Sequence, residues 1–421
     1  MRARVWCSLL LFAAPVPQAV TLNGKAFPQV APYVVHLLPA RRTIAGDGSD
    51  LQTALRALKR GDQLRVKAGT YVGDLKIDAN CQSGPITIVF DVKSSVTGNV
   101  TIARPDWHLS NLFVTRGAIA IEASSVTIDR LRIAGSVTIG HVRDVTISNS
   151  RIARAGVGLD ISDGARHIVI ANNHVYENPT AGIRLNGARD VKIVGNMLRD
   201  NGAAILAAKA NDVEITDNTI ENSAAETRGI ALDEVTHAVI HSNHSTGVGV
   251  AVAIGRIDTL RNVALPADDV MIDHNYFETG AVAASIEAGN GVHFVNNVVD
   301  GYASDTVVLG KSPKNVVIAN NLFLGASTTA FVVRDPAVLR LFDFNVFSTA
   351  DEAIKVEVGS ETITLQNFLA RQTMTHTTQI RGVHFLDRDL GRIAGVDTVD
   401  RGTRVGIAFK GAAPDLGVAE R

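Results

Sequence analysis

The stretch DVKIVGNMLRDNGAAILAAK, residues 190–209, contains three short runs of apolar residues separated by turn residues. The runs are VKIV, MLR and AAILA, and they are divided by Gly-Asn and by Asp-Asn-Gly. Apolar alternation with a period of two predicts β-strands, and Gly and Asn predict turns between them. The stretch is therefore expected to form three short strands in succession.

The same pattern recurs along the chain as an apolar residue followed three positions later by Asn. The Asn positions are Asn173, Asn196, Asn218, Asn243, Asn275, Asn297, Asn321 and Asn345. Their spacings of 23, 22, 25, 32, 22, 24 and 24 residues are typical of a solenoid, and the units are too short for pairs of helices. Ile147/Ser150 and Ile128/Leu131 begin the series without Asn. Stacking would place equivalent residues about 4.8 Å apart in parallel sheets.

This repeat resembles that of the pectate-lyase-like superfamily of right-handed parallel β-helices, in which Asn side chains stack along one turn. The segment GDGSDLQTALRALKRGDQLRVKAGTYVG, residues 46–73, is similar to the opening of many polysaccharide lyases of that fold. The resemblance implies an all-β chain, a single-stranded right-handed parallel β-helix with an N-terminal capping helix over residues 44–345. Residues 346–421 are expected to complete the β-helix and add an irregular closing segment.

The capping helix is predicted from its own residues. Ser49 or Asp50 can cap its N-terminus, and Gly61 ends it. Its apolar stripe consists of Leu51, Ala54, Leu55 and Leu58. Such a stripe would cover the open end of the stacked units.

Composition narrows the possible partners and the location. The 41 Lys and Arg residues nearly balance 42 Asp and Glu residues, so no global charge favours nucleic acid. Residues 1–19 have the pattern of a signal peptide, which predicts a secreted or periplasmic protein, and no later run predicts stable membrane insertion. Cys7 and Cys81 lack metal-type spacing, and no structural disulfide is expected. We expect a monomer.

The residues of a β-helix core serve stability, so function is expected on the outer face of one sheet or in the loops at the turns. In the superfamily the usual site is the sheet that precedes the variable first turn, and the strands GLDIS, GIRLN, AILAAK, GIALDE, VAIGR, SIEAG, VVLGK, FVVRD and IKVEV are assigned to it here. If Leu159, Ile161, Ile183 and Leu185 point inward, alternate residues point outward. The outward and strand-end residues are Asp160, Arg184, Asn186, Lys209, Asp233, Glu234, Arg256, Glu287, Lys311, Arg334, Lys355 and Glu357.

These mixed charges suit an acidic polysaccharide, and the insertion RIDTLRNVALPADD could wall one side of a groove. The leading hypothesis is a lyase that acts by β-elimination. Lys209 or Arg256 would remove the C5 proton of a uronate, Arg184 would neutralise its carboxylate, and a second group would protonate the leaving oxygen. Asp233 and Glu287 complete the candidate catalytic set. Asn186, Lys311 and Arg334 are the candidate substrate-binding residues.

Other functions remain open on the same surface. Asp233 and Glu287, two turns apart, also suit an inverting glycoside hydrolase, and C5 epimerisation is a further alternative. Calcium is the candidate ion, with Asp233, Glu234 and Glu287 as oxygen ligands, although the sequence requires no cofactor. The Arg-x-Pro-x-x-Arg stretch of pectate lyases and the Asp-Pro-His-Asp stretch of alginate epimerases are absent. A non-catalytic protein that binds glycan or assembles an envelope polymer, with its surface charges paired, is the alternative of another class.

Histidines gather beside the repeated Asn. They are His174, His241, His244, His274 and His293. The HSNH stretch at residues 241–244 is a weak metal motif because it lacks a third ligand. We interpret these histidines as exposed or capping residues of turns.

Overall fold

A computed structural model describes residues 21–22, 25–26, 42–46 and most of 51–417. The gaps after residue 51 are 60, 80–84, 223–226, 259–262, 303–304, 326–328, 350–353, 372–375, 382–384, 388–391, 394–400 and 406–412. Residues 1–19, Cys7, Cys81 and the predicted helix caps Ser49 and Asp50 lie outside the described part. None of its helices is long and apolar enough to cross a membrane.

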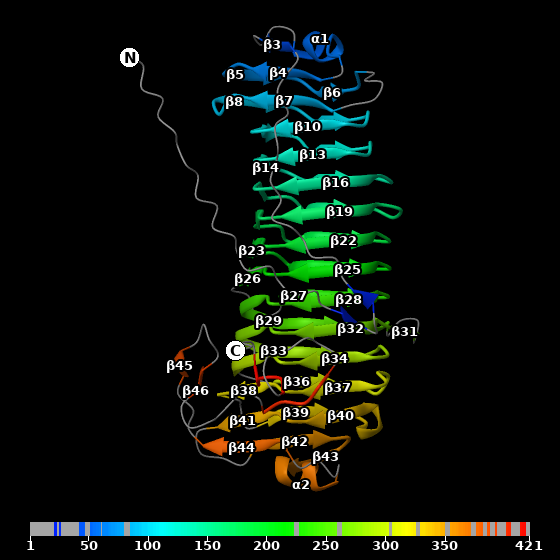
Figure 1. Ribbon diagram of the computed structural model, residues 1–421, viewed down its shortest axis with the longest axis vertical. Helices are drawn as coiled ribbons and strands as arrows, with labels where there is room; N and C mark the ends of the chain where they lie inside the picture. The colour runs from blue at the N-terminus through cyan, green and yellow to red at the C-terminus, as the bar shows by residue number, and fades with distance from the viewer. Residues whose placement is uncertain are drawn as a thin grey trace, which may run out of the picture.

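Three short strands form each turn of a solenoid, as the repeat predicts (Figure 1). In the unit quoted above they are β22 (Arg189–Val194), β23 (Met197–Arg199) and β24 (Ala203–Ala208). Each strand pairs in parallel with its counterparts in the neighbouring turns. The result is a parallel β-helix with three faces, which we name sheets I, II and III in the order in which each turn visits them.

Sheet I contains fourteen strands. They are β3 (Arg42–Gly46), β4 (Asp62–Val66), β7 (Ile86–Phe90), β10 (Trp107–Ser110), β13 (Val126–Asp129), β16 (Arg143–Ser148), β19 (Arg166–Ala171), β22, β25 (Asn211–Thr216), β28 (Thr236–His241), β32 (Asp268–Asp273), β34 (Val292–Val295), β37 (Val316–Ala319) and β40 (Leu339–Asp343). It faces the viewer along the length of the stack in Figure 1.

Sheets II and III are joined because β29 (His244–Ile254) and β33 (Tyr276–Ile286) run unbroken from one to the other. Sheet II otherwise contains β5 (Gly69–Val72), β8 (Ser94–Thr97), β11 (Phe113–Arg116), β14 (Arg132–Ala134), β17 (Arg151–Ala153), β20 (His174–Tyr176), β23, β26 (Thr219–Glu221), β35 (Val298–Tyr302), β38 (Leu322–Leu324), β41 (Val346–Thr349) and β44 (Thr378–Arg381). Sheet III contains β6 (Leu75–Ile77), β9 (Val100–Ile102), β12 (Ile119–Ile121), β15 (Val137–Ile139), β18 (Val157–Ile161), β21 (Ala181–Asn186), β24, β27 (Arg228–Asp233), β36 (Val307–Leu309), β39 (Thr329–Val333) and β42 (Lys355–Val358).

A short helix lies at each end of the stack (Figure 1). At the N-terminal end is α1 (Leu51–Arg56), whose Leu51 and Leu55 are buried, which confirms the predicted cap. At the C-terminal end β42 pairs antiparallel with β43 (Glu361–Thr364), and α2 (Leu365–Arg371) follows. The Phe368 ring of α2 packs edge-on against Phe342 at 5.4 Å between centroids. Both open ends of the apolar core are thereby closed.

The core consists of ladders of apolar side chains that continue from turn to turn. One ladder on sheet I runs through Leu64, Ile88, Leu109, Ile128, Ile147, Ile170, Ile193, Ile215, Ile240, Ile272, Phe294, Ile318 and Phe342, all fully buried. Full burial of one such side chain contributes about 1.5–3 kcal/mol. A single turn cannot shield its own apolar face, so stability depends on stacking.

The repeated Asn residues form a continuous hydrogen-bonded ladder at the corner between sheets I and II. From Asn173 to Asn345, each Nδ2 donates to the Oδ1 of the next Asn at 2.9–3.1 Å. The same Oδ1 accepts the backbone N–H of the preceding Asn. Ser150 and Leu131 extend the ladder toward the N-terminus, as the repeat predicts.

The residue before each ladder position has left-handed backbone geometry. Its φ lies between 51° and 65° at Asn149, Asn172, Gly195, Asp217, Ser242, His274, Asn296, Asn320 and Phe344. A left-handed residue bends the chain sharply, and Asn, Asp and Gly adopt that geometry most readily. The bend turns the next side chain into the corner, where the ladder amides are buried.

A second Asn ladder, which the sequence analysis missed, occupies the corner between sheets II and III. Asn178 Nδ2 donates to Asn201 Oδ1 at 2.9 Å, and the backbone N–H of Asn201 donates to Asn222 Oδ1 at 3.0 Å. All three residues are buried. They follow Asn173, Asn196 and Asn218 by five, five and four residues, a signal that a second alignment of the repeat would have revealed.

Three features lie outside the regular stack. The insertion after Gly255 contains the antiparallel pair β30 (Arg256–Asp258) and β31 (Val263–Leu265), which projects from the side of the stack (Figure 1). Near the C-terminus, Val405 packs on the outer face of sheet I and Leu416 on that of sheet II. The remaining elements are η1 (Pro336–Val338) and the antiparallel pairs β1 (Thr21–Leu22) with β2 (Lys25–Ala26) and β45 (Phe385–Asp387) with β46 (Arg392–Ile393).

Removal of one ladder amide should destabilise the fold. In Asn196→Ala the buried N–H of Asn173 loses its acceptor and the carbonyl of Ile170 loses a donor. Each buried group left unpaired costs about 1–3 kcal/mol, so urea unfolding followed by circular dichroism should show a clearly lower midpoint. The control Asn186→Ala, at an exposed site on sheet III, should change stability by less than about 0.5 kcal/mol. Equal midpoints for the two variants would contradict the role of the ladder.

Candidate functional site

The outer face of sheet III has the orientation that the sequence predicts. Leu159, Ile161, Ile183 and Leu185 are fully buried, so the alternate residues face outward. Register defines one outward row: Lys76, Thr101, Ala120, Thr138, Asp160, Arg184, Leu206, Ala231, Ala253, Ser285, Val308, Val332 and Glu357. Its middle, from Leu206 to Val332, carries only small or apolar side chains. The charged residues therefore lie at the two ends of this stretch and along its strand edges.

Arg184 is engaged by a carboxylate of the preceding turn. Its Nε donates to Asp160 Oδ1 at 2.9 Å and its Nη2 to Asp160 Oδ2 at 2.6 Å. This hydrogen bonding raises the pKa of the Arg184 guanidinium, which is half-buried. The bidentate contact follows from register, because Asp160 and Arg184 are direct partners in adjacent strands. Arg184 therefore has fewer donors available to a substrate than the sequence analysis assumed.

Arg256 makes a different contact with Asp233. Its Nε donates to Asp233 Oδ2 at 2.6 Å, and the side chain of Asp233 is 13% exposed while that of Arg256 is 52% exposed. Arg256 is also the first residue of β30, so the projecting hairpin begins at this ion pair. Among the residues that the structure describes, none contacts the terminal nitrogens of Arg256 by a hydrogen bond or ion pair. The buried carboxylate holds the guanidinium by one nitrogen and leaves the others facing solvent.

Lys209 and Glu234 occupy the same turn position on successive coils. Both are exposed and both have left-handed backbone geometry, with φ of 54° and 52°. The backbone N–H of Lys209 donates to the carbonyl of Asp233 at 3.0 Å, which places Lys209 beside the Asp233–Arg256 pair. Among the described residues, no ion pair joins the Lys209 ammonium to a carboxylate. Lys209 is thus a cation without a partner between two arginines that have one.

The remaining predicted residues spread along the strand ends. Asn186 is exposed at the end of β21, and Glu287 is half-buried with Ser285 Oγ at 3.4 Å from its carboxylate. Lys311 and Arg334 are exposed on later turns. Asp233, Glu234 and Glu287, the predicted calcium ligands, are not brought into one group. Within the part of the chain that the structure describes, three metal-ligating side chains converge elsewhere.

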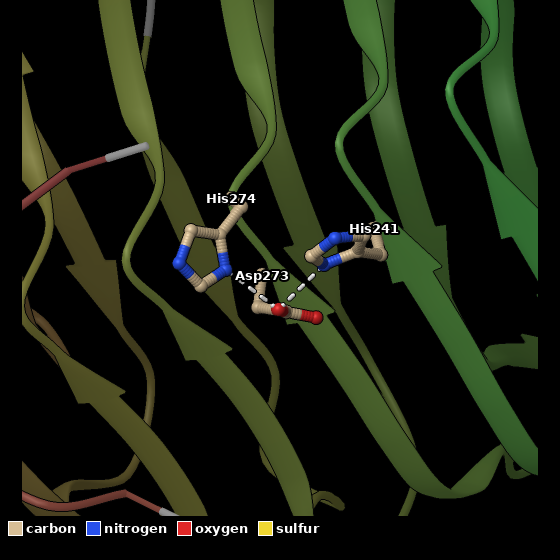
Figure 2. Close-up of side chains that lie close together, drawn as sticks. All are labelled: His241, Asp273 and His274. Atoms are coloured by element: carbon tan, nitrogen blue, oxygen red, sulfur yellow. Dashed lines mark hydrogen bonds and ion pairs between the residues drawn. The ribbon is translucent and has the colours of Figure 1, made fainter. Parts of the chain in front are cut away.

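That convergence is at the corner between sheets I and II, where His241, Asp273 and His274 meet (Figure 2). Asp273 Oδ2 accepts from Nδ1 of His241 at 2.8 Å and from Nδ1 of His274 at 2.8 Å. The Asp273 side chain is 1% exposed, and those of His241 and His274 are 27% and 11% exposed. His241 ends β28, Asp273 ends β32, and the two are direct partners across the strands.

The charges of the cluster support one another. Burial alone would raise the pKa of Asp273, but His241 and His274 hold it well below its usual range. Burial would lower the pKa of His241, yet the charge and hydrogen bond of Asp273, together with Asp217 and Glu214, raise it. Burial raises the pKa values of Glu214 and Asp217 themselves. Three carboxyl groups, those of Asp273, Asp217 and Glu214, therefore act on His241.

The two histidines of the HSNH stretch separate in the structure. His244 points to sheet II, where its Nε2 lies 3.2 Å from Glu278 and its ring packs against Tyr276. The other two potential ligands beside His241 come from the next turn and are Asp273 and His274. Asp273 was not among the predicted site residues, although an alignment of IHSN at 240–243 with IDHN at 272–275 sets it beside His241.

Comparisons with known proteins agree with this architecture. Residues 135–263 match the family model described as a right handed beta helix region. A PL6 alginate lyase solved in complex with a trisaccharide aligns with a TM-score of 0.54 and 13% identity, over 84% of this chain and 91% of that one. The PL6 family alginate lyase AlyGC aligns with a TM-score of 0.52 and 13% identity, over 83% of this chain and 54% of that one. No curated protein sequence matches.

The fold is therefore a right-handed parallel β-helix, as the repeat and the resemblance predicted. At 13% identity the solved structures establish the fold alone. The activity has to be argued from the residues of the site.

Loss of the Asp273 carboxylate should destabilise the corner. In Asp273→Ala the Nδ1 groups of His241 and His274 lose their shared acceptor. A buried hydrogen-bonded group of this kind contributes about 1–3 kcal/mol, which thermal unfolding should register as a lower melting temperature. The control Glu361→Ala removes an exposed ion pair with Arg371 and should leave the melting temperature almost unchanged. If Asp273→Ala had the same melting temperature as the control, the cluster would have no role in stability.

Proposed function

We propose that this chain is an exported lyase that cleaves an acidic polysaccharide by β-elimination on the outer face of sheet III. The observation that carries the proposal is the row of charges at one strand edge, where the unpaired Lys209 stands beside the Asp233–Arg256 ion pair. Next to it, the outward row from Leu206 to Val332 carries only small or apolar side chains. Likeness in fold to alginate lyases over 84% of the chain supports this class of substrate.

Arg256 is the residue best placed to hold the uronate carboxylate. Asp233 accepts a hydrogen bond only from Nε of Arg256, so the two terminal nitrogens of Arg256 can donate as a pair to a carboxylate of the substrate. Neutralisation of that carboxylate stabilises the negative charge that develops when the C5 proton leaves. Asp233 acts as a positioning residue because it fixes the guanidinium plane. This role replaces the one first assigned to Arg184, which Asp160 occupies with two hydrogen bonds.

Lys209 is the proposed base. In its neutral form the amine takes the C5 proton, the C4–O bond to the leaving sugar breaks, and a C4=C5 double bond forms in conjugation with the carboxylate. The leaving oxygen receives a proton from a second group or from water. Asn186, Lys311 and Arg334 extend the polar edge along neighbouring turns, at about 4.8 Å per turn, and would contact further sugars of the chain.

Calcium, if it takes part, would bind jointly to the substrate and a single carboxylate of this edge, because Asp233, Glu234 and Glu287 do not form one group. Inverting hydrolysis and C5 epimerisation are alternatives on the same edge. Hydrolysis would use Glu287 with Asp233, but Asp233 is already paired with Arg256. The proposed export is supported by the signal-peptide pattern of residues 1–19.

A second candidate function is a non-catalytic glycan-binding protein. The ion pairs of Arg184 with Asp160 and of Arg256 with Asp233 favour it, because paired charges are typical of a surface that does not perform chemistry. The two candidates differ in whether the polymer is cleaved. They agree on the sheet to which it binds.

The lyase proposal is tested by absorbance near 235 nm, where the new double bond of the product absorbs, during incubation with alginate, pectate and glycosaminoglycans with and without calcium. Lys209→Ala should lower the rate by about 10²–10⁴-fold and Arg256→Ala by about 10²–10³-fold. Lys355→Ala, which removes an exposed cation of the same sheet several turns away, should retain the rate of the parent chain.

Each result separates the candidates. A flat trace with every polymer and no new reducing ends, together with retention on an acidic-polysaccharide column, would replace the lyase by the binding protein. New reducing ends without the absorbance would indicate hydrolysis. Activity that survives both Lys209→Ala and Arg256→Ala would move the site away from this edge.

A further inference from the structure

We infer that His241, Asp273 and His274 form a binding site for a divalent transition-metal ion of the zinc class, separate from the proposed polysaccharide edge. One ligand atom from each residue lies within 4.8 Å of the other two. Two imidazoles and one carboxylate are a common zinc donor set and differ from the all-oxygen sets that calcium prefers. Figure 2 shows the two rings on either side of the Asp273 carboxylate.

The spacing of the ligand atoms needs little adjustment. Each Nδ1 lies 2.8 Å from Asp273 Oδ2. Ligands held about 2.0 Å from a tetrahedral zinc ion are separated by about 3.3 Å, so the side chains would move apart by about half an ångström. The ion would replace the hydrogen atoms that now join the nitrogens to the carboxylate.

A second observation concerns the other oxygen of the same carboxylate. Asp273 Oδ1 is buried and has no hydrogen-bond partner in the described part of the chain, although both histidines bond to Oδ2. A buried carboxylate oxygen without a donor is costly, and such atoms often mark the place of an ion or an ordered water. A cation bound between the three side chains would compensate the charge that Oδ1 now carries without a partner.

The Asn ladder holds the ligands in place. Asn243 Nδ2 donates to the backbone carbonyl of His241 at 3.1 Å, and Asn275 Nδ2 donates to that of Asp273 at 3.0 Å. His274 has the left-handed φ of 54° that the corner requires. The backbones of all three ligands are therefore fixed by the most regular hydrogen-bond network of the fold. A rigid backbone reduces the entropy that is lost when an ion binds.

Charge and access also favour a cation. Asp217 and Glu214, from the preceding turn, act electrostatically on His241 and add negative potential. Glu214 is partly compensated by Lys192, whose Nζ lies 3.2 Å from it. The His241 side chain is 27% exposed, so an ion can enter from solvent. Three protein ligands leave one coordination position to water, as in open zinc sites.

The test uses the full chain, freed of metal with a chelator that is then removed, and titrated with Zn²⁺ by isothermal calorimetry. One equivalent should bind. His241→Ala and His274→Ala should each weaken binding by more than about 100-fold, the upper limit of second-shell effects. His244→Ala is the matched control, because it removes the other imidazole of the HSNH stretch while leaving the cluster intact, and it should bind as the parent chain does.

A spectroscopic measurement on the parent chain tests metal binding even if a variant fails to fold. The parent chain titrated with Co²⁺ should develop the visible bands of four-coordinate cobalt, and circular dichroism should show that each variant is folded. Absence of stoichiometric Zn²⁺ binding by the parent chain would overturn the inference. So would binding that is as tight in a folded His274→Ala variant as in the His244→Ala control. Neither outcome depends on the 235 nm assay, so failure of the lyase proposal would leave this one standing.

Discussion

The Asn ladder at the corner between sheets I and II is the constraint on which the rest of the structure depends. Each amide bonds to both neighbouring turns, so every turn is held in register with the next. That register brings Asp160 opposite Arg184 and His241 opposite Asp273. A shift of one residue in the strand register would exchange the inward and outward side chains of a strand and break both contacts. The Asn ladder therefore positions the residues of both candidate sites, although the ladder itself contains no reactive group.

Periodicity in the sequence was enough to predict the fold, the three strands of each turn and the direction of the side chains on sheet III. Side chains alternate between inward and outward along a strand, and Leu159 and Ile161 are buried as this alternation predicts. Contacts between turns were harder to predict, because they depend on which residues align across repeats of unequal length. Arg256 meets Asp233 only because Gly255 ends its strand one residue earlier, and Asp273 meets His241 across the longest repeat, of 32 residues.

The two candidate sites lie at different corners of the same coil. Sheet I lies between them, with the polysaccharide edge at the turn that enters it and the histidine cluster at the turn that leaves it. At the edge, the paired arginines and a lysine that has no ion pair among the described residues are the groups to which we assign charge neutralisation and proton removal. At the other corner, burial and acidic neighbours favour a cation. In both candidate sites the side chains come from residues at the ends of strands, beside the turns.

The most direct test of the central claim is the crystal structure of the Lys209→Ala variant with a bound oligouronate prepared from a polymer that the parent chain binds. The account predicts sugar density along the outer face of sheet III, with a uronate carboxylate at the terminal nitrogens of Arg256. Density on the outer face of sheet I or sheet II, with the Arg256 edge empty, would contradict it.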